Sequence, residues 1–188
     1  MTASGVAFNV SRRIDIGGRP LFIIDDCFRR DQIADIYRFV RDLPYRLDDY
    51  DTAGTAGVRH LKAELPLTLA ETAPGFKDCV RIAHELLVRP PVGLDRVHAN
   101  MMLHGDLQHP HTDIPDGVTA IYYANPEWQE SWAGETLFYD AAREPIHVVA
   151  PRPGRLAIFH SEILHRAGVP SRVCFEPRIT VAFKFSRM

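Results

Sequence analysis

The sequence has few cysteines, and none of them form a recognised pair. Cys27, Cys79 and Cys174 lie far apart along the 188 residues, and no C-x-x-C motif occurs. This excludes a disulfide framework and a thiolate zinc site as the basis of the fold. We interpret the three cysteines as buried free thiols of a cytoplasmic protein.

Long hydrophobic runs are also missing. No apolar stretch approaches the roughly 20 residues that a membrane-spanning helix needs. Residues 1–9 lack a basic start followed by an apolar run, so we expect no signal peptide. The sequence therefore predicts a soluble protein without a membrane partner.

Charge of one sign does not predominate either. Lys and Arg number 22 against 24 Asp and Glu, with a net charge of −2 and no long run of one sign. Nucleic-acid binding needs a basic patch, so we do not expect nucleic acid as a partner. The hydrophobic fraction of 46% is high enough for a sizeable core, and the length fits one domain.

The first half, residues 1–91, predicts a scaffold of one strand and two helices. The apolar run at residues 20–24 suits a buried strand. Asp31 is the expected N-cap of the first helix, and Pro90 and Pro91 stop the second. Residues 45–57 show no periodicity and predict a long loop. Apolar residues recur at helical spacing in both helices: Ile33, Ile36, Tyr37, Val40 and Leu43, then Phe76, Val80, Ala83 and Leu87.

The second half, residues 92–188, predicts an all-β core. Short β-branched and aromatic segments alternate with Gly, Pro, Asp and Asn, which is typical of strands joined by turns. We expect a jelly roll or barrel with the two N-terminal helices packed on one sheet, an α+β arrangement within a single domain, 1–188. The expected strands are residues 97–103, 119–123, 135–139, 146–149, 155–159 and 178–185.

The segment His-Pro-His-Thr-Asp at residues 109–113 offers metal ligands. On a strand, His111 and Asp113 point to the same face. His165, 54 positions after His111, is the best third ligand. Two histidines and one carboxylate on one face of a metal leave three positions open, as in non-haem iron(II) oxygenases.

Each of these ligands has a competitor in the sequence, which contains nine histidines. His104 and Asp106 form a second H-x-D pair, although the glycine between them favours a turn. His109 would give a zinc-like cluster with His111 and Asp113, but Pro110 perturbs strand pairing. His160 competes with His165.

The C-terminal strand offers a carboxylate-binding pair. Residues 178–185 alternate, with Ile179, Val181, Phe183 and Phe185 on one face and Arg178 and Thr180 on the other. A guanidinium two residues before a hydroxyl can bind a carboxylate through charge-assisted hydrogen bonds. Arg172 is the alternative and ranks below Arg178.

The order His111-x-Asp113, His165, Arg178-x-Thr180 resembles the iron(II)/2-oxoglutarate-dependent dioxygenase superfamily, and within it the prolyl 4-hydroxylase-like branch. Residues 123–128 (YANPEW), 133–136 (AGET) and 151–159 (PRPGRLAIF) are similar to that branch's "Y-L-N-x-x-W", "G-G-E-T" and "P-x-x-G-x-L-x-x-F" stretches. The likeness covers residues 97–185, with a weaker echo at residues 22–26. Two positions depart from the branch: Arg178 stands where it often has Lys, and Ala133 replaces a glycine.

The resemblance implies a double-stranded β-helix that uses Fe(II), 2-oxoglutarate and O₂. By position, His111, Asp113 and His165 match the iron ligands. Arg178 matches the residue that binds the distal carboxylate of 2-oxoglutarate, with Thr180 beside it. The remaining expected cosubstrate contacts are Tyr123, preferred over Tyr122, and Asn100.

The resemblance also implies an activity. Because family halogenases lack the carboxylate ligand, the presence of Asp113 favours hydroxylation, or a related desaturation or epimerisation, over halogenation. We expect a small-molecule substrate of amino-acid or natural-product type, with a peptidyl or prolyl residue as the alternative. Residues 45–57 and 127–131, with Trp128 and Trp132, are candidate lids. Two other readings stay open: a metallohydrolase using His109, His111 and Asp113, or a catalytically silent β-barrel binding module.

Overall fold

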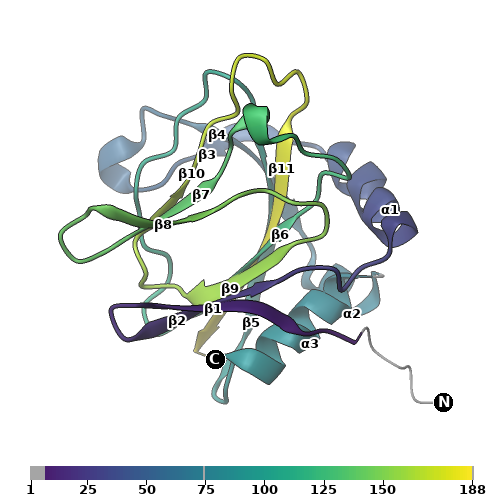
Figure 1. Ribbon diagram of the computed structural model, residues 1–188, viewed down its shortest axis with the longest axis vertical. Helices are drawn as coiled ribbons and strands as arrows, with labels where there is room; N and C mark the ends of the chain where they lie inside the picture. Colours follow the sequence, from purple (N-terminus) through teal and green to yellow (C-terminus); the bar gives the residue numbers. More distant parts are fainter. Residues whose placement is uncertain (1–6, 74, 188) are drawn as a thin grey trace.

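A computed structural model of the chain describes residues 7–73 and 75–187. In this part of the chain two antiparallel sheets face each other, and helices cover the outer face of the larger one (Figure 1). The large sheet has the order β1 (Val10–Ile16), β2 (Arg19–Ile24), β9 (Leu156–His160), β6 (Val118–Tyr123), β11 (Arg178–Arg187), β5 (Val92–Met102), β4 (His60–Leu65) and β3 (Arg46–Asp49). The small sheet has the order β10 (His165–Ala167), β7 (Thr136–Tyr139) and β8 (Pro145–Val149). The helices are α1 (Arg30–Arg41), α2 (Leu67–Thr72) and α3 (Phe76–Leu86), with short 3-10 turns η1 (Ala53–Thr55) and η2 (Glu130–Trp132).

The hydrophobic core lies on both faces of the large sheet. One cluster joins the helices to the sheet and includes Ile33, Ile36 and Val40 of α1, Phe76, Cys79, Ile82 and Ala83 of α3, and Ile179, Val181, Phe183 and Phe185 of β11. A smaller cluster on the opposite face includes Leu21, Ile23, Tyr123, Phe138, Val149, Ala157, Phe159 and Ile163. The two clusters together fix the large sheet between the helices and the small sheet, as the patterning of the sequence predicts.

Strand β11 confirms the alternation seen in the sequence. It pairs with β6 along one edge and β5 along the other, and its first eight residues are buried on both faces. Its odd-numbered apolar residues pack under the helices, while Arg178, Thr180 and Lys184 lie buried on the other face. All six strands expected in the second half are present, together with β10, which was not predicted.

The expectation of a long loop at residues 45–57 is wrong. This segment contains β3 and η1, and β3 pairs with β4, another strand that was not anticipated. Strand β3 lies at the edge of the sheet and is largely exposed on both faces. Because neither face is buried, its sequence carries no alternation of apolar and polar residues.

The helical scaffold differs from expectation at two points. The N-cap of α1 is Arg29 rather than Asp31, which lies in the first turn and pairs with the Arg29 side chain at 2.8 Å. The short helix α2 was not anticipated, because its single apolar turn is too short to show a helical period. Val80 of α3 and Leu87, the C-cap of this helix, pack at the edge of the apolar cluster.

The three cysteines are free and buried, as expected. No helix among the described residues has the length and apolar character needed to cross a membrane.

Candidate metal centre

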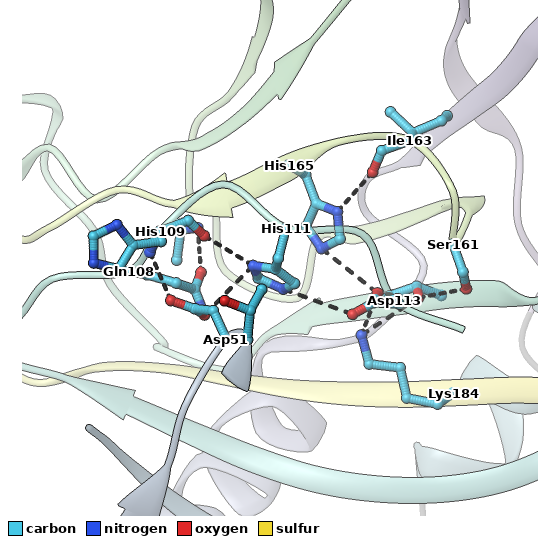
Figure 2. A network of polar contacts seen from close by, with 12 residues as sticks. Asp51, Gln108, His109, His111, Asp113, Ser161, Ile163, His165 and Lys184 are labelled. Atoms are coloured by element: carbon cyan, nitrogen blue, oxygen red, sulfur yellow. Dashed lines mark hydrogen bonds and ion pairs between the residues drawn. The ribbon is translucent and has the colours of Figure 1, made fainter. Parts of the chain in front are cut away.

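The side chains of His111, Asp113 and His165 converge between the two sheets (Figure 2). One potential ligand atom from each residue lies within 4.8 Å of the others. His111 Nε2 is 3.6 Å from Asp113 Oδ1, and His165 Nε2 is 3.5 Å from Asp113 Oδ2. The two nitrogens and the carboxylate therefore surround a common point, which is the arrangement a single metal ion requires.

Backbone pairing brings these residues together. His111 and His165 form an isolated antiparallel bridge, with N···O distances of 2.9 and 3.0 Å in the two directions. The Asp113 N–H donates to the Ser161 carbonyl at 2.8 Å. The expectation that His111 and Asp113 share a regular strand is thus only partly right, since Pro110 has no N–H to continue the ladder.

Hydrogen bonds fix the orientation of both imidazole rings. His111 Nδ1 lies 2.9 Å from the His109 carbonyl oxygen, and His165 Nδ1 lies 2.9 Å from that of Ile163. A carbonyl oxygen only accepts, so Nδ1 carries the proton in each ring. Each Nε2 therefore keeps a free lone pair that points toward Asp113.

Asp113 is held as a carboxylate. Its Oδ2 accepts hydrogen bonds from Lys184 Nζ and from Thr119 Oγ1, the latter at 2.6 Å. Burial alone would raise its pKa, but the charge of Lys184, joined by those of His165 and His111 once acid protonates the two rings, outweighs this and holds the pKa well below the usual range. Burial lowers the pKa of His165 to about 4, so this ring is neutral near pH 7. Deprotonated donors of this kind suit a divalent transition metal.

Asp51 joins the site from the segment between β3 and η1, although the sequence did not predict it as a site residue. Its Oδ1 lies 3.1 Å from His60 Nε2 and 3.4 Å from His111 Nδ1, and its Oδ2 accepts the His109 N–H at 2.6 Å (Figure 2). The hydrogen bond to Asp51 raises the pKa of His60. Lys184 was missed as well, although it shares the face of Arg178 and Thr180 at a spacing of two.

Arg178 is 2% exposed and held at several points. Its Nε donates to the Gly134 carbonyl at 2.6 Å and its Nη2 to Thr136 Oγ1 at 3.1 Å. The guanidinium carbon lies 5.4 Å from the centre of the Tyr123 ring, whose hydroxyl is 2.7 Å from Thr136 Oγ1. None of the hydrogen bonds found among the described residues uses Nη1, so this group remains available to a ligand.

A cavity of about 290 Å³ connects the metal cluster with Arg178. It is lined by six of the expected site residues: Asn100, His111, Asp113, His165, Arg178 and Thr180. Tyr123 lies behind Arg178 rather than in the lining, and Tyr122 packs under the helices. Of the two candidate lids, residues 49–51 line the cavity, whereas none of residues 127–131 does.

The competing ligands are not part of the metal cluster found among the described residues. His109 and His160 do not join the cluster of ligand atoms. Leu103 and Asp106 form the turn expected around His104, in which Asp106 Oδ2 accepts the Leu103 N–H at 2.6 Å. Arg172 is exposed and does not line the cavity.

Comparison with known proteins agrees with this geometry. Residues 97–185 match the model of the 2OG-Fe(II) oxygenase superfamily, a span that runs from within β5 to within β11 and contains the metal cluster and Arg178. The matched span, 89 of the 188 residues, is thus similar to this superfamily. The protein is an enzyme, and its cofactor and cosubstrates are Fe(II), 2-oxoglutarate and O₂. No curated protein matches the sequence.

Solved structures share the fold at low identity. An oxidoreductase of the 2OG-Fe(II) oxygenase family from Burkholderia pseudomallei is 18% identical, with a TM-score of 0.67 over 89% of this chain and 85% of that one. A prolyl-4-hydroxylase from Pseudomonas putida is 19% identical, with a TM-score of 0.59 over 86% and 89%. A non-haem α-ketoglutarate-dependent epimerase from nogalamycin biosynthesis is 17% identical, with a TM-score of 0.64 over 88% and 77%. The fold is thus common to proteins with different substrates.

Proposed function

We propose that the protein hydroxylates a small-molecule substrate and that His111, Asp113 and His165 bind its iron. The observation that carries this proposal is the convergence of two imidazole Nε2 atoms and one carboxylate within 4.8 Å. Both Nδ1 atoms are already bonded to backbone carbonyls, so the donor set is oriented before a metal arrives. Three protein ligands on one side leave the opposite side open.

When bound, Fe(II) supplies the chemistry in which 2-oxoglutarate and O₂ become succinate and CO₂ while the substrate is oxidised. The protein orients the reactants and excludes water. Lys184 and Thr119 occupy Asp113 Oδ2, which leaves Oδ1 as the freer oxygen for the metal.

Arg178 is the proposed partner of the distal carboxylate of 2-oxoglutarate. It is buried and fixed through Nε and Nη2, and its Nη1 can donate to a carboxylate without further ordering. Thr180, on the same face, adds a hydroxyl donor. Asn100 lies opposite Thr180 in the register of β5 and β11. Tyr123 supports the guanidinium from behind.

The size of the cavity favours a small substrate. At about 290 Å³ it is near the lower limit of ligand pockets. The likeness to a prolyl-4-hydroxylase makes a proline residue of a peptide the second candidate. The free thiols suit a reducing compartment, so we propose the cytoplasm as the location.

The test is an anaerobic titration of 2-oxoglutarate into the Fe(II)-loaded protein, followed by visible absorption. We expect a metal-to-ligand charge-transfer band in the wild type, no band in His111→Ala and a weaker one in Arg178→Ala. Arg172→Ala is the matched control and should resemble the wild type, since Arg172 is exposed. A flat spectrum from folded, iron-loaded wild type would refute the proposal. Succinate release in air, with small molecules and prolyl peptides, then separates the two substrate classes.

A further inference from the structure

The cavity has two ends along β11, and the proposed function uses only one of them. Arg178 and Lys184 both line it and are six residues apart, which corresponds to about 20 Å along a strand. The Arg178 end is the proposed position of 2-oxoglutarate. The other end is lined by Arg96, His98 and Lys184 and has no ligand in that proposal.

His98 is a buried polar side chain without a visible partner. It is 4% exposed, it lines the cavity, and its Nδ1 has no hydrogen-bond partner among the described residues. Burial, together with the charges of Lys184, Arg96 and Lys62, holds the pKa of His98 well below its usual value. The ring is therefore neutral and offers one N–H donor, and a buried group of this kind ordinarily has a partner.

Arg96 lies two residues before His98 on the same face of β5, opposite Lys184 of β11 in register. Among the described residues, none of the hydrogen bonds or ion pairs involves Arg96. The acidic residues nearby are already engaged: Asp113 with Lys184, Asp49 with Lys62 at 2.8 Å, Asp51 with His60 at 3.1 Å, and Glu64, opposite His98 in register, with Lys62 at 3.0 Å. Arg96 is exposed, so water can reach its guanidinium, and no carboxylate among the described residues pairs with it.

We propose that Arg96 and His98 form a subsite that binds a carboxylate of the substrate, so that the substrate is a small carboxylic acid. The guanidinium can bind a carboxylate through two parallel hydrogen bonds, and the His98 N–H adds a third. Lys184 raises the positive potential at this end. The subsite is separate from the one for 2-oxoglutarate, because Arg178 lies at the opposite end of the strand. This inference rests on the proposed function.

The experiment uses the Fe(II)-loaded full-length protein with 2-oxoglutarate and O₂. The probes are the twenty proteinogenic L-amino acids and, for each, the corresponding carboxamide. Stimulated succinate release is the readout. We expect at least one acid to stimulate release, and its carboxamide to do so at least tenfold less effectively.

Two substitutions test whether Arg96 and His98 bind the substrate carboxylate. Arg96→Gln should raise the KM for the stimulating acid at least tenfold, while the anaerobic affinity for 2-oxoglutarate changes less than twofold. His98→Phe, which keeps a planar ring without the N–H, should raise the same KM severalfold. Arg187→Gln is the matched control, since Arg187 is exposed and outside the cavity lining.

The outcomes separate the two proposals. Absence of the charge-transfer band in the wild type means that the proposed function is wrong. If the band forms but acids and carboxamides act equally, or Arg96→Gln matches the wild type, the subsite assignment is wrong. It is also wrong if the band forms and no acid of the panel stimulates release, including the case in which only a prolyl peptide does.

Discussion

Asp51 places a buried carboxylate against one of the proposed metal ligands. Its Oδ1 lies 3.4 Å from His111 Nδ1, and its Oδ2 also fixes the backbone of His109. Groups that orient a ligating histidine typically contribute a factor of about 10 to 100 in metal affinity. We expect Asp51→Asn to weaken Fe(II) binding about tenfold, measured by anaerobic competition with a chelating indicator.

Asp48→Asn is the control for this substitution. Asp48 is exposed and pairs with Arg46 on the edge strand β3, so its loss should leave the Fe(II) affinity unchanged. Equal affinities of wild type and Asp51→Asn would show that Asp51 does not position His111.

Lys184 neutralises a buried carboxylate, so its loss should be costly in the absence of metal. Breaking a buried ion pair by removing one partner typically costs about 3–5 kcal/mol. We expect Lys184→Met to lower the free energy of unfolding of the metal-free protein by about 3 kcal/mol. Saturating Mn²⁺ should recover part of this, because the ion gives Asp113 a new positive partner.

Urea unfolding with and without Mn²⁺ measures both effects. Lys77→Met is the control, because Lys77 is exposed on α3. A loss no larger than that of a surface pair, about 1 kcal/mol or less, would mean that Lys184 does not stabilise Asp113.

At the scale of secondary-structure elements, the sequence predicts those strands that have one apolar, buried face and one polar face. Strand β11 has an apolar face toward the helices and a polar face toward the cavity, so its period of two predicts both its structure and the position of Arg178. The same period places Lys184 on the cavity face of the strand. Its pairing with Asp113 could not be predicted, because the two residues are 71 positions apart in the sequence. The edge strand β3 and the three-residue β10 have no such period.

The candidate site likewise contains residues that the sequence predicts and residues that it does not. His111, Asp113 and His165 were predicted as ligands from their order along the chain, and the backbone bridge between His111 and His165 brings these two residues together. Asp51 and His98 were not found, because nothing in the local sequence marks them. Their relation to the cavity arises only when β3, β4 and β5 pair in register.

The close approach of two backbones after β10 offers a test of how precisely the small sheet places His165. The Gly168 N–H donates to the Glu135 carbonyl at 2.6 Å, and a Cβ at Gly168 would lie 2.5 Å from that oxygen. Gly168→Ala must therefore displace β10 from β7. We expect a loss of stability of about 2 kcal/mol and weaker Fe(II) binding, measured by urea unfolding and indicator competition.

Gly57→Ala is the matched control, because a Cβ there would meet nothing within 4 Å. If Gly168→Ala lost stability but kept the Fe(II) affinity of the wild type, the placement of His165 would not depend on this contact.

At the scale of the whole molecule, the metal cluster connects the two sheets. His165 belongs to the small sheet and His111 pairs with it, whereas Asp113 is bonded to Lys184 of the large sheet. The opposite face of the large sheet carries the helical core, which contains Cys27 and Cys79. A metal ion at the cluster should therefore stabilise the core on the far side, provided that the domain unfolds as one unit.

The two thiols can report this coupling. Burial raises the pKa of Cys27 to about 12 and that of Cys79 well above its usual value, so neither reacts readily with iodoacetamide at pH 8 in the folded state. Labelling then requires opening of the structure. Mn²⁺ at 100 times its dissociation constant should slow the labelling of both cysteines about 100-fold, followed by mass spectrometry of the peptides.

His111→Ala supplies the control, because its labelling rate should not respond to Mn²⁺. An unchanged rate in the wild type, with Mn²⁺ shown to be bound, would mean that the helical layer opens without disturbing the cluster. The helices would then form a separate cooperative unit, and a substitution there would change stability without changing metal affinity. A rate slowed in the wild type alone would show that the iron site and the helical core share one unfolding transition.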